Sequence, residues 1–381
     1  MLWGSVAEFA GAMDQVQTLF LDFHNCYYPM GDVFTTEQKP VNGYLYSGFF
    51  ASLLAVVALL PIDSAAAVWA GLQVVTAVWF YAVSAELLPG LSTRGRVLYL
   101  LLFLTSLPLL HNFKYGQVST FITLGIAMAF MYQYQGRSAT AGLALAAVAS
   151  IKYYPGVFVI YFAIQRDTRF LISFAVGMLV FYVMVPALLL GIDGWLGFTT
   201  ARLGDFPTSR LFYGAPGSQY FVHVLLRWSY NLDNTMSEAT YDALRWLSAV
   251  LFALHFVLAE WFRRRGGAPA RALATVTLLL ALPLVVPSSW PHYFIYLPLC
   301  QITLALCVAD WAAGSWIRRL WWLPLAVSIA STSIYFFLAF PFWKLYYNVG
   351  MLAFASLLSL ATVYGLAASM YLQRRRGAEF C

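Results

Sequence analysis

The first chemically distinctive feature of the sequence is a carboxylate set among aromatic and polar residues. Asp22 lies in the stretch LDFHNCYYP, residues 21–29, ahead of a long succession of apolar segments. A carboxylate in such a place is a candidate general base, because it can accept the proton of an attacking hydroxyl group. Tyr27 of the same stretch is a candidate substrate contact. The alternative for Asp22 is a structural role, as the cap of a helix or the partner of an arginine.

Other polar and basic side chains occur in the breaks between the later apolar segments. Lysine and arginine can hold a phosphate group, and the imidazole of a histidine can donate or accept a hydrogen bond. We therefore expect substrate-binding residues among Lys114, Gln117, Lys152, Arg202, Arg210, Ser218, Gln219, Trp290 and His292. The alternative for Lys152 is a lysine that extends to the membrane interface, and for Trp290 with His292 it is an interfacial aromatic belt. Arg202 and Arg210 could instead contact lipid headgroups or solvent.

The elements that must position these side chains are membrane helices. The 381 residues are 61% hydrophobic and 10% charged, which is typical of a polytopic membrane protein. The net charge of +6 does not indicate a nucleic-acid partner, because the arginine clusters are short and each adjoins an apolar segment. The four cysteines are scattered, and their spacing predicts neither a disulfide framework nor a metal site. We expect no metal ion and no cofactor.

A transmembrane helix needs about 20 mostly apolar residues to cross the hydrocarbon core. The apolar segments predict an all-α polytopic membrane protein, a helical bundle of about 11 to 12 transmembrane helices in a single domain, residues 1–381. The predicted crossings, some of them short, lie near residues 65–88, 97–111, 117–135, 138–151, 154–165, 170–192, 244–262, 268–287, 293–311, 319–341 and 346–372. Along the chain we expect an outer-face first loop, a helical core, a large outer loop and C-terminal helices, in residues 1–64, 65–192, 193–243 and 244–381.

Two segments near the start of the sequence do not fit a simple crossing. Residues 43–61 are apolar but short, and we expect a re-entrant or interfacial helix there on the outer face. The first twenty residues contain Glu8 and Asp14 and do not make a good span. Either the chain starts outside the membrane, or a first helix precedes this sequence, and we favour the second.

The basic residues assign the breaks to the two sides of the membrane. Arginines cluster at alternate breaks, in residues 94–96, 137, 166–169, 263–271, 318–319 and 374–376, and the positive-inside rule makes these breaks and the C-terminus cytoplasmic. All four lysines fall on the opposite, outer side, where binding of an anion explains them better than topology does. The candidate site residues share that outer side, so one cavity open to lipid and water could gather them.

Several of these stretches resemble glycosyltransferase family 87, and together they cover most of the chain. NFKYGQV, residues 112–118, is similar to the family's Asn-x-x-x-Gly-Gln-Val signature, and IKYYP, residues 151–155, to its Lys-x-x-Pro. Residues 22–28 resemble its acidic residue followed by aromatics, and YSGFFA, residues 46–51, its Tyr-Pro-Pro-Leu-Phe-Ala helix without the double proline.

Two later stretches resemble the family less closely. GSQY, residues 217–220, resembles a degraded Asn-Gln-Ser element, and PSSWPHY, residues 287–293, resembles Ser-Pro-x-Ser-Trp-Asp-His-His. Pro291 stands where that pattern has its acidic residue, and Tyr293 where it has the second histidine. These departures leave the acceptor unassigned.

The resemblance implies an integral-membrane enzyme of the GT-C class without a cofactor. Such an enzyme transfers mannose, with inversion, from polyprenyl phosphate mannose to a glycolipid or glycan acceptor outside the cytoplasm. It implies Asp22 as the base, Lys152 or outer arginines at the phosphate, and His292 near the acceptor or the phosphate.

Two other classes of protein would share this composition. A transporter or flippase would be expected to show internal repeats or charges at the membrane midplane, but we find no convincing repeat, and most charges lie near predicted helix ends. A lipid-linked glycan polymerase or ligase would also work at the outer face with polyprenyl carriers. Arginine-led sites are more typical of that class than an early aspartate.

Overall fold

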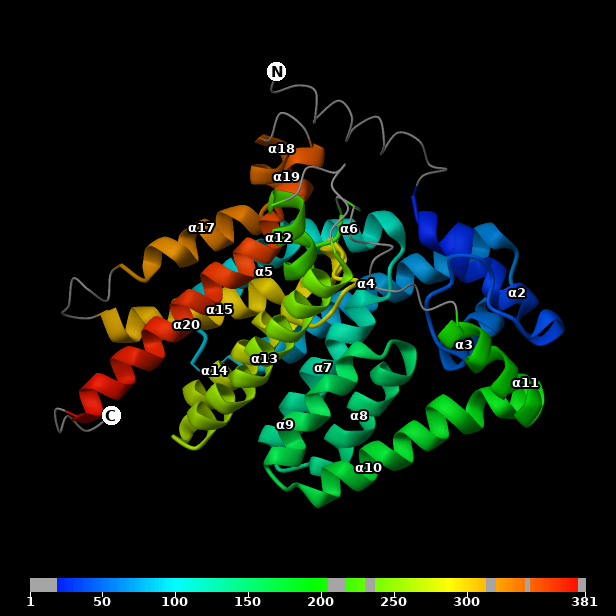
Figure 1. Ribbon diagram of the computed structural model, residues 1–381, viewed down its shortest axis with the longest axis horizontal. Coiled ribbons are helices and arrows are strands. Elements are labelled where there is room, and N and C mark those ends of the chain that lie inside the picture. Colours follow the sequence, from blue (N-terminus) through cyan, green and yellow to red (C-terminus); the bar gives the residue numbers. More distant parts are fainter. Residues whose placement is uncertain are drawn as a thin grey trace. The chain divides into compact units, whose positions relative to one another are not determined.

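The computed structural model describes residues 19–88, 90–204, 215, 217–229, 237–312, 320–339 and 343–375. Every regular element within these ranges is a helix (Figure 1). Extended pairing in this part of the chain is limited to an isolated bridge between Ser106 and Ser333. The all-helical fold class expected from the sequence is confirmed.

The contacts of the chain divide it into two compact units, each of which contains described helices. The N-terminal unit is formed by Phe9–Leu87 with Leu110–Thr208, and the C-terminal unit by Met1–Glu8, Leu88–Leu109 and Ser209–Cys381. Each unit is described by itself below, and the expected division of the chain into domains remains a prediction.

The N-terminal unit contains both short and long helices. They are η2 (Phe23–Tyr27), α2 (Tyr28–Glu37), α3 (Gly48–Val57), α4 (Ile62–Glu86), α7 (Ser119–Tyr134), α8 (Ser138–Ile151), η3 (Tyr154–Phe158), α9 (Val159–Ile164), α10 (Thr168–Met178), η4 (Leu179–Met184) and α11 (Val185–Gly204). Helix α6 (Leu107–Tyr115) begins in the C-terminal unit and ends in this one.

The central helices of the N-terminal unit approach one another closely at glycines. Helix α8 packs against α7 and α10, and α4 packs against α7. A Cβ atom on Gly142 of α8 would lie 2.5 Å from the carbonyl oxygen of Phe170 in α10. A Cβ atom on Gly125 of α7 would lie 2.2 Å from a methyl group of Val148 in α8. Small residues at such contacts let membrane helices pack backbone to backbone, and here they set the position of α8.

The C-terminal unit contains most of the remaining helices. They are α5 (Thr93–Leu104), α12 (Phe221–Ser229), α13 (Glu238–Arg263), α14 (Gly267–Leu280), η6 (Leu282–Leu284), η7 (Pro291–Tyr296), α15 (Leu297–Ala312), α17 (Trp322–Thr332), α18 (Ile334–Ala339), α19 (Trp343–Val349) and α20 (Met351–Arg375). Helix α15 packs against α17, and both contact α20. The buried Gln301 amide donates to the hydroxyls of Ser328 and Thr332 at 2.9 and 2.8 Å, which links α15 to α17.

Six helices in the described part of the chain are long and apolar enough to cross a membrane. They are Ile62–Glu86, Thr168–Arg202, Glu238–Arg263, Gly267–Leu284, Pro291–Ala309 and Met351–Leu372. Four more apolar helices, Gly48–Val57, Ser138–Ile151, Tyr154–Ile164 and Trp322–Thr332, have only 10–17 residues. They fall short of the roughly 20 residues that a crossing requires. The chain is a multi-helix membrane protein, but the expected 11 to 12 crossings are not confirmed.

One sequence-based boundary was wrong. The span expected at 97–111 is divided, because α5 ends at Leu104 and α6 begins at Leu107. Helix α6 then continues to Tyr115, through the break expected between the crossings at 97–111 and 117–135. Pro108 explains the break, since a proline has no N–H group to donate to the preceding turn. The segment 193–243, expected as a large outer loop, contains the end of α11, all of α12 and the start of α13. Its position on the outer side remains a prediction.

Three further expectations have different outcomes. Residues 43–61 contain the short helix α3, begun by the Ser47 hydroxyl, which accepts from the Phe50 N–H at 3.3 Å. Its re-entrant or interfacial position remains a prediction. The expectation about the chain start and the candidate Arg210 fall outside the described residues.

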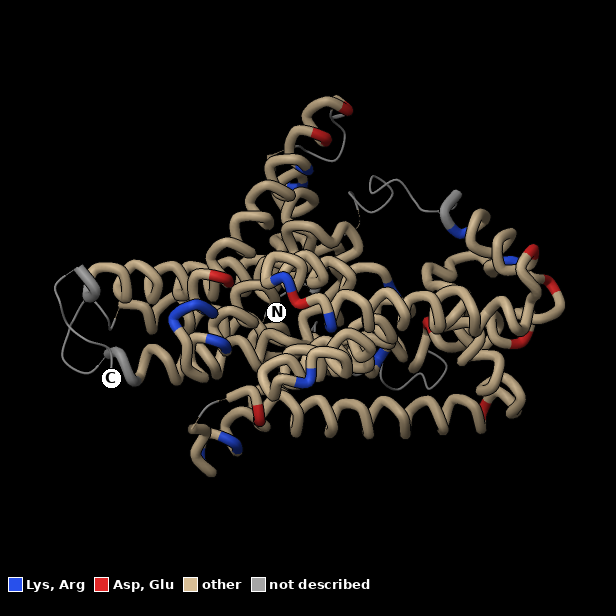
Figure 2. The backbone as a smooth tube through the Cα atoms, turned by 90° about the horizontal axis from the view of Figure 1, so that it is seen from below, with Lys and Arg blue, Asp and Glu red and all other residues tan. Residues whose placement is uncertain are grey.

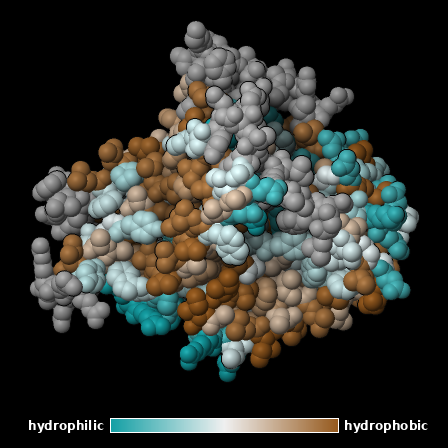
Figure 3. All heavy atoms as spheres, viewed as in Figure 1, coloured by the Kyte–Doolittle hydropathy of each residue, from teal (hydrophilic) through white to brown (hydrophobic). Residues whose placement is uncertain are grey.

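The exposed surface of the long helices is apolar. Val78 of α4, Ile172 of α10 and Leu188 of α11 are 63%, 65% and 81% exposed. Hydrophobic side chains cover much of the face in Figure 3, and long stretches of helix in Figure 2 carry no charged residue. Contiguous exposed apolar surface of this kind matches a lipid environment.

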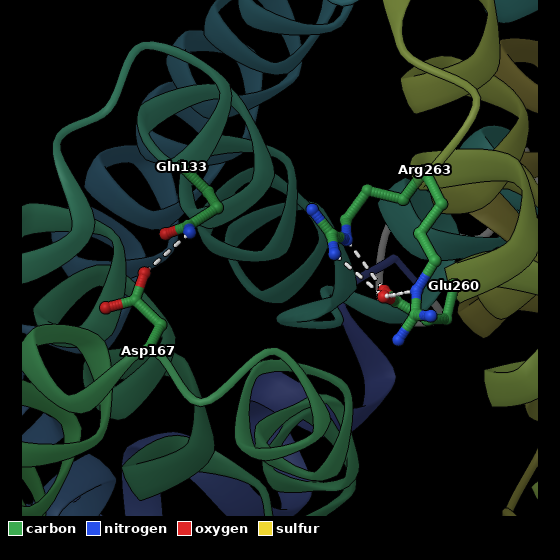
Figure 4. A network of polar contacts seen from close by, with 5 residues as sticks. Gln133, Asp167, Glu260 and Arg263 are labelled. Atoms are coloured by element: carbon green, nitrogen blue, oxygen red, sulfur yellow. Dashed lines mark hydrogen bonds and ion pairs between the residues drawn. The ribbon is translucent and has the colours of Figure 1, made fainter.

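Charged residues near helix ends make polar contacts within their own unit (Figure 4). In the N-terminal unit, the Gln133 amide donates to Asp167 at 2.7 Å. In the C-terminal unit, Glu260 accepts from two nitrogens of Arg263 at 2.6 and 2.7 Å and from Arg264 at 2.7 Å. Both carboxylates are engaged by side chains of their own unit.

Candidate active site

Asp22 lies at the start of a short π-helix in the N-terminal unit. The preceding Phe20 has a left-handed backbone with φ of 58°, and its N–H donates to the Lys114 carbonyl at 2.8 Å. Asp22 occupies the N-cap position of η2, but its side chain makes no capping hydrogen bond. Since the carboxylate does not cap the helix, the capping alternative for Asp22 is not what the structure shows. π-Helical turns are rare and occur frequently at functional sites.

The half-buried Asp22 carboxylate accepts a hydrogen bond from a residue far along the chain. Nε2 of Gln117 donates to Oδ2 of Asp22. The Gln117 side chain is 5% exposed, and its Oε1 accepts from the hydroxyl of Tyr46 at 2.9 Å and lies 3.0 Å from that of Tyr27. The Tyr27 hydroxyl also donates to the Tyr46 hydroxyl at 2.6 Å. Two candidates from the sequence, Gln117 and Tyr27, therefore join Asp22 in one network.

Lys152 enters this network from the end of α8. Its Nζ donates to the Tyr46 hydroxyl at 3.3 Å and lies 4.5 Å from the centre of the Tyr46 ring. Burial lowers the pKa of Lys152 to about 7, although the negative charge of Asp22 acts in the opposite direction. The charge of Arg202 adds to the lowering. Lys152 thus contacts a tyrosine of the site and feels the charge of its carboxylate.

The pKa of Asp22 is raised above the ordinary value for an aspartate. Burial is the largest cause, and the hydrogen bond from Gln117 and the charge of Lys152 both act to lower the pKa. A carboxylate with a raised pKa is a stronger base than an ordinary aspartate and is suited to accept a proton. The electrostatics of Asp22 therefore favour a role as a general base.

Arg202 is a second cation of the N-terminal unit. It lies near the end of α11 and is 2% exposed. Its positive charge acts on Lys152 and on the buried Tyr44. The residue is therefore not a solvated loop arginine but part of the interior beside Lys152.

Aromatic rings pack against the segment that carries the carboxylate. The Trp69 ring of α4 stacks between Phe23 and Phe121, with centroid distances of 5.5 and 5.4 Å. The indole N–H of Trp69 donates to the Gly116 carbonyl at 2.8 Å. Trp69 and Tyr46 were not among the sequence candidates. Tyr46 lies in a motif that could have singled it out, whereas a tryptophan within an apolar helix carries no local signal of such a contact.

Lys114 contributes mainly through its backbone, since its carbonyl holds Phe20. Its Nζ lies 5.6 Å from the centre of the Tyr115 ring. Burial lowers the pKa of Lys114. The expectation that its ammonium group binds a substrate remains a prediction.

Ser218 and Gln219 are fully buried in the C-terminal unit and bond to protein groups. Oγ of Ser218 lies 2.7 Å from Nδ1 of His223. The Gln219 amide donates to the Tyr347 carbonyl at 3.0 Å, and its oxygen accepts from the Leu352 N–H at 3.3 Å. These contacts tie the start of α12 to the α19–α20 connection and describe a packing role.

Trp290 and His292 also belong to the C-terminal unit. A Cβ atom on Gly217 would lie 2.2 Å from the Trp290 ring, so a glycine is needed beneath this tryptophan. The His292 ring is 4% exposed and lies 5.0 Å from the Tyr293 ring. An interfacial aromatic belt requires rings at the protein surface, and the burial of His292 does not match this alternative. Its expected place at the acceptor or phosphate remains a prediction.

The described residues contain no candidate metal site. No three His, Cys, Asp or Glu side chains there converge in a group that could hold an ion. The expectation of a metal-free site stays a prediction.

The comparison with known families agrees with the motif resemblance. The profile of glycosyltransferase family 87 matches residues 44–287, more than half of the 381 residues. The matched range contains Gln117, Lys152 and Arg202, and it begins after Asp22. No curated protein and no solved structure matches the chain.

Proposed function

The chain belongs to glycosyltransferase family 87 and is a membrane glycosyltransferase, and from this we propose a specific reaction. The protein transfers a hexose from a polyprenyl phosphate sugar to a hydroxyl group of a glycolipid or glycan acceptor, and we propose mannose as this hexose. The single observation that supports this most strongly is the Asp22 carboxylate with a raised pKa, in one network with the cation Lys152.

One carboxylate is enough for this chemistry. Glycosidases usually need two, because the alcohol that leaves must be protonated by an acid. A phosphate leaves as a stabilised anion and needs cations instead of an acid. The N-terminal unit offers this combination of one base, Asp22, and two cations, Lys152 and Arg202.

The proposed step is a single displacement at the anomeric carbon. The acceptor oxygen forms a bond to that carbon while its proton passes to Asp22. The bond from the anomeric carbon to the phosphate oxygen breaks, and both of its electrons leave with the polyprenyl phosphate. Lys152 and Arg202 stabilise the charge of this leaving group. Attack from the face opposite to the phosphate inverts the anomeric configuration.

We place this reaction at the extracytoplasmic face of the cytoplasmic membrane. The positions of the lysines and the arginine clusters along the sequence support this side. A lipid donor reaches such a site from the bilayer, so the partners are the polyprenyl phosphate sugar, the acceptor and the surrounding lipids. The C-terminus is cytoplasmic in this arrangement.

The deciding experiment measures transfer of labelled mannose from polyprenyl phosphate mannose in membranes that carry the wild-type chain or Asp22→Asn. Loss of base assistance should reduce the rate by about 10²- to 10⁴-fold. Asp32→Asn is the matched control, because Asp32 is exposed on the neighbouring α2. Its rate should equal that of the wild type.

Three outcomes would contradict parts of the proposal. Equal rates for wild type and Asp22→Asn would exclude Asp22 as the base. Transfer from polyprenyl phosphate glucose or galactose, and not from the mannose donor, would replace the sugar. Absence of transfer from every donor of this kind would exclude the polyprenyl phosphate sugar as donor. That result would favour a flippase or a glycan polymerase instead.

A further inference from the structure

The turn that carries Gln117 is held against the Asp22 segment by a glycine. Gly116 has a left-handed backbone with φ of 67°. A Cβ atom there would lie 3.0 Å from the Phe20 ring and 3.1 Å from Cβ of Phe23, the residues on either side of the Asp22 segment. A glycine tolerates both the backbone conformation and the close approach. Gly116 thereby allows the turn to reach the carboxylate.

Backbone contacts fix the same turn from both ends. The Gln117 N–H donates to the Asn112 carbonyl at 2.9 Å, and the Gly116 carbonyl accepts from the Trp69 indole at 2.8 Å. The Asn112 side chain in turn accepts from the Ser119 N–H at 3.1 Å, which joins the turn to α7. The position of Gln117 relative to Asp22 is therefore determined by the folded backbone.

Both the oxygen and the nitrogen of the Gln117 side-chain amide bond to protein groups. Its oxygen faces the hydroxyls of Tyr27 and Tyr46, which can donate, and its nitrogen faces Asp22. An ionised carboxylate only accepts, so this amide orientation fits an ionised Asp22. Lys152 donates to Tyr46, Tyr46 donates to the Gln117 oxygen, and the Gln117 nitrogen donates to Asp22. Each hydrogen bond from the lysine to the aspartate therefore has one donor and one acceptor.

We propose that Gln117 is a positioning residue for Asp22, placed by the Gly116 turn and oriented by Tyr27 and Tyr46, and that it does not contact the substrate. This inference rests on the proposed function, since it gives Gln117 its purpose only if Asp22 is the base. It changes the role expected for Gln117 from the sequence, which was substrate binding.

A donor to a carboxylate favours the charged form, so its removal raises the pKa of Asp22. The base works when it is deprotonated, and activity therefore rises as pH increases through its pKa. This rise is the acid limb of the pH profile, and without the Gln117 amide it should move to higher pH. The other titratable groups that act on or feel the Asp22 charge are Lys152, Cys26 and Tyr115, and all three remain in the variants.

The experiment measures kcat/KM for mannosyl transfer against pH in detergent-purified full chain. Gln117→Met removes the donor at similar size and should move the acid limb upward by about one to two pH units. Gln117→Glu keeps the shape but faces Asp22 with a second carboxylate, and like charges should move the limb further. At a pH below the shifted limb, kcat of both Gln117 variants should fall below that of the wild type. Their KM for the donor should stay within about twofold of the wild-type value, since Gln117 does not contact the donor.

Gln133→Met is the matched control, because Gln133 also donates an amide hydrogen bond to a carboxylate, Asp167, in the same unit. Its acid limb should coincide with that of the wild type. If Gln117→Met does not accumulate, the near-isosteric Gln117→Glu decides the question alone.

The outcomes separate this inference from the proposed function. An active Asp22→Asn variant would overturn the base and with it the reason for a positioning residue. An inactive Asp22→Asn variant with an unmoved acid limb in both Gln117 variants would overturn the positioning role alone. A raised KM for the donor with an unmoved limb would make Gln117 a substrate contact.

Discussion

At the scale of single residues, Asp22 and Lys152 have pKa values that burial moves toward each other. Burial raises the pKa of the aspartate and lowers that of the lysine to about 7. Each group therefore changes charge closer to neutral pH than it would in water. A base and a cation with such values make the activity of the enzyme sensitive to pH on both sides of its optimum.

Lys152 should determine the alkaline side of the pH profile. It must be protonated to stabilise a phosphate, so wild-type kcat/KM for the donor should fall as pH rises through about 7. Lys152→Arg should remove this limb, because the guanidinium stays protonated, while Lys152→Met should lose roughly 10- to 100-fold at low pH. The profile of kcat/KM against pH checks both. An unchanged limb in Lys152→Arg would assign it to another group.

At the scale of elements, α8 depends on small residues for its position. Gly142 lets α8 lie against the backbone of α10, and Lys152 follows the last residue of α8. A displacement of this helix would move the ammonium group away from Tyr46. The packing of α8 therefore determines the position of Lys152, the cation that we propose for the leaving phosphate.

Gly142→Ala should destabilise the protein, since its Cβ atom would lie 2.5 Å from backbone. Overpacking of this kind costs about 1 to 3 kcal/mol. The midpoint of thermal unfolding in detergent should fall for Gly142→Ala. Gly71→Ala in α4 is the control, because an added Cβ atom meets nothing within 4 Å there. Its midpoint should stay or rise, as alanine favours helix, and equal losses in both variants would refute close packing at Gly142.

At the scale of the whole molecule, the described residues include six long apolar helices and a large exposed apolar surface. The arginines lie in short clusters along the sequence, and the lysines fall between other segments. This distribution predicts one orientation in the membrane.

The orientation can be tested with reporter fusions. A fluorescent protein at the C-terminus should fluoresce, and alkaline phosphatase at the same point should be inactive, because the C-terminus is expected in the cytoplasm. Phosphatase fused after Thr240, at the end of the expected outer segment, should be active. The reverse pattern would place Asp22 on the cytoplasmic side.

Much of the fold follows from local patterns in the sequence. Apolar composition predicts membrane helices, and the helix expected at 138–151 is α8, with the same bounds. The motif at residues 112–118 also indicated the family that the profile later confirmed. Short helices such as α9 do not follow from these patterns, because hydropathy alone does not distinguish a short packed helix from a crossing.

The sequence by itself determined the class of protein, its helical character and its family, because hydropathy and motifs are properties of neighbouring residues. Only the tertiary structure decided that Gln117 donates to Asp22 and that Tyr46 joins them to Lys152. It also decided that Ser218 and Gln219 bond to protein groups in the interior. The physical reason is that these contacts join residues far apart along the chain, and they form only when packing fixes the helices that carry them.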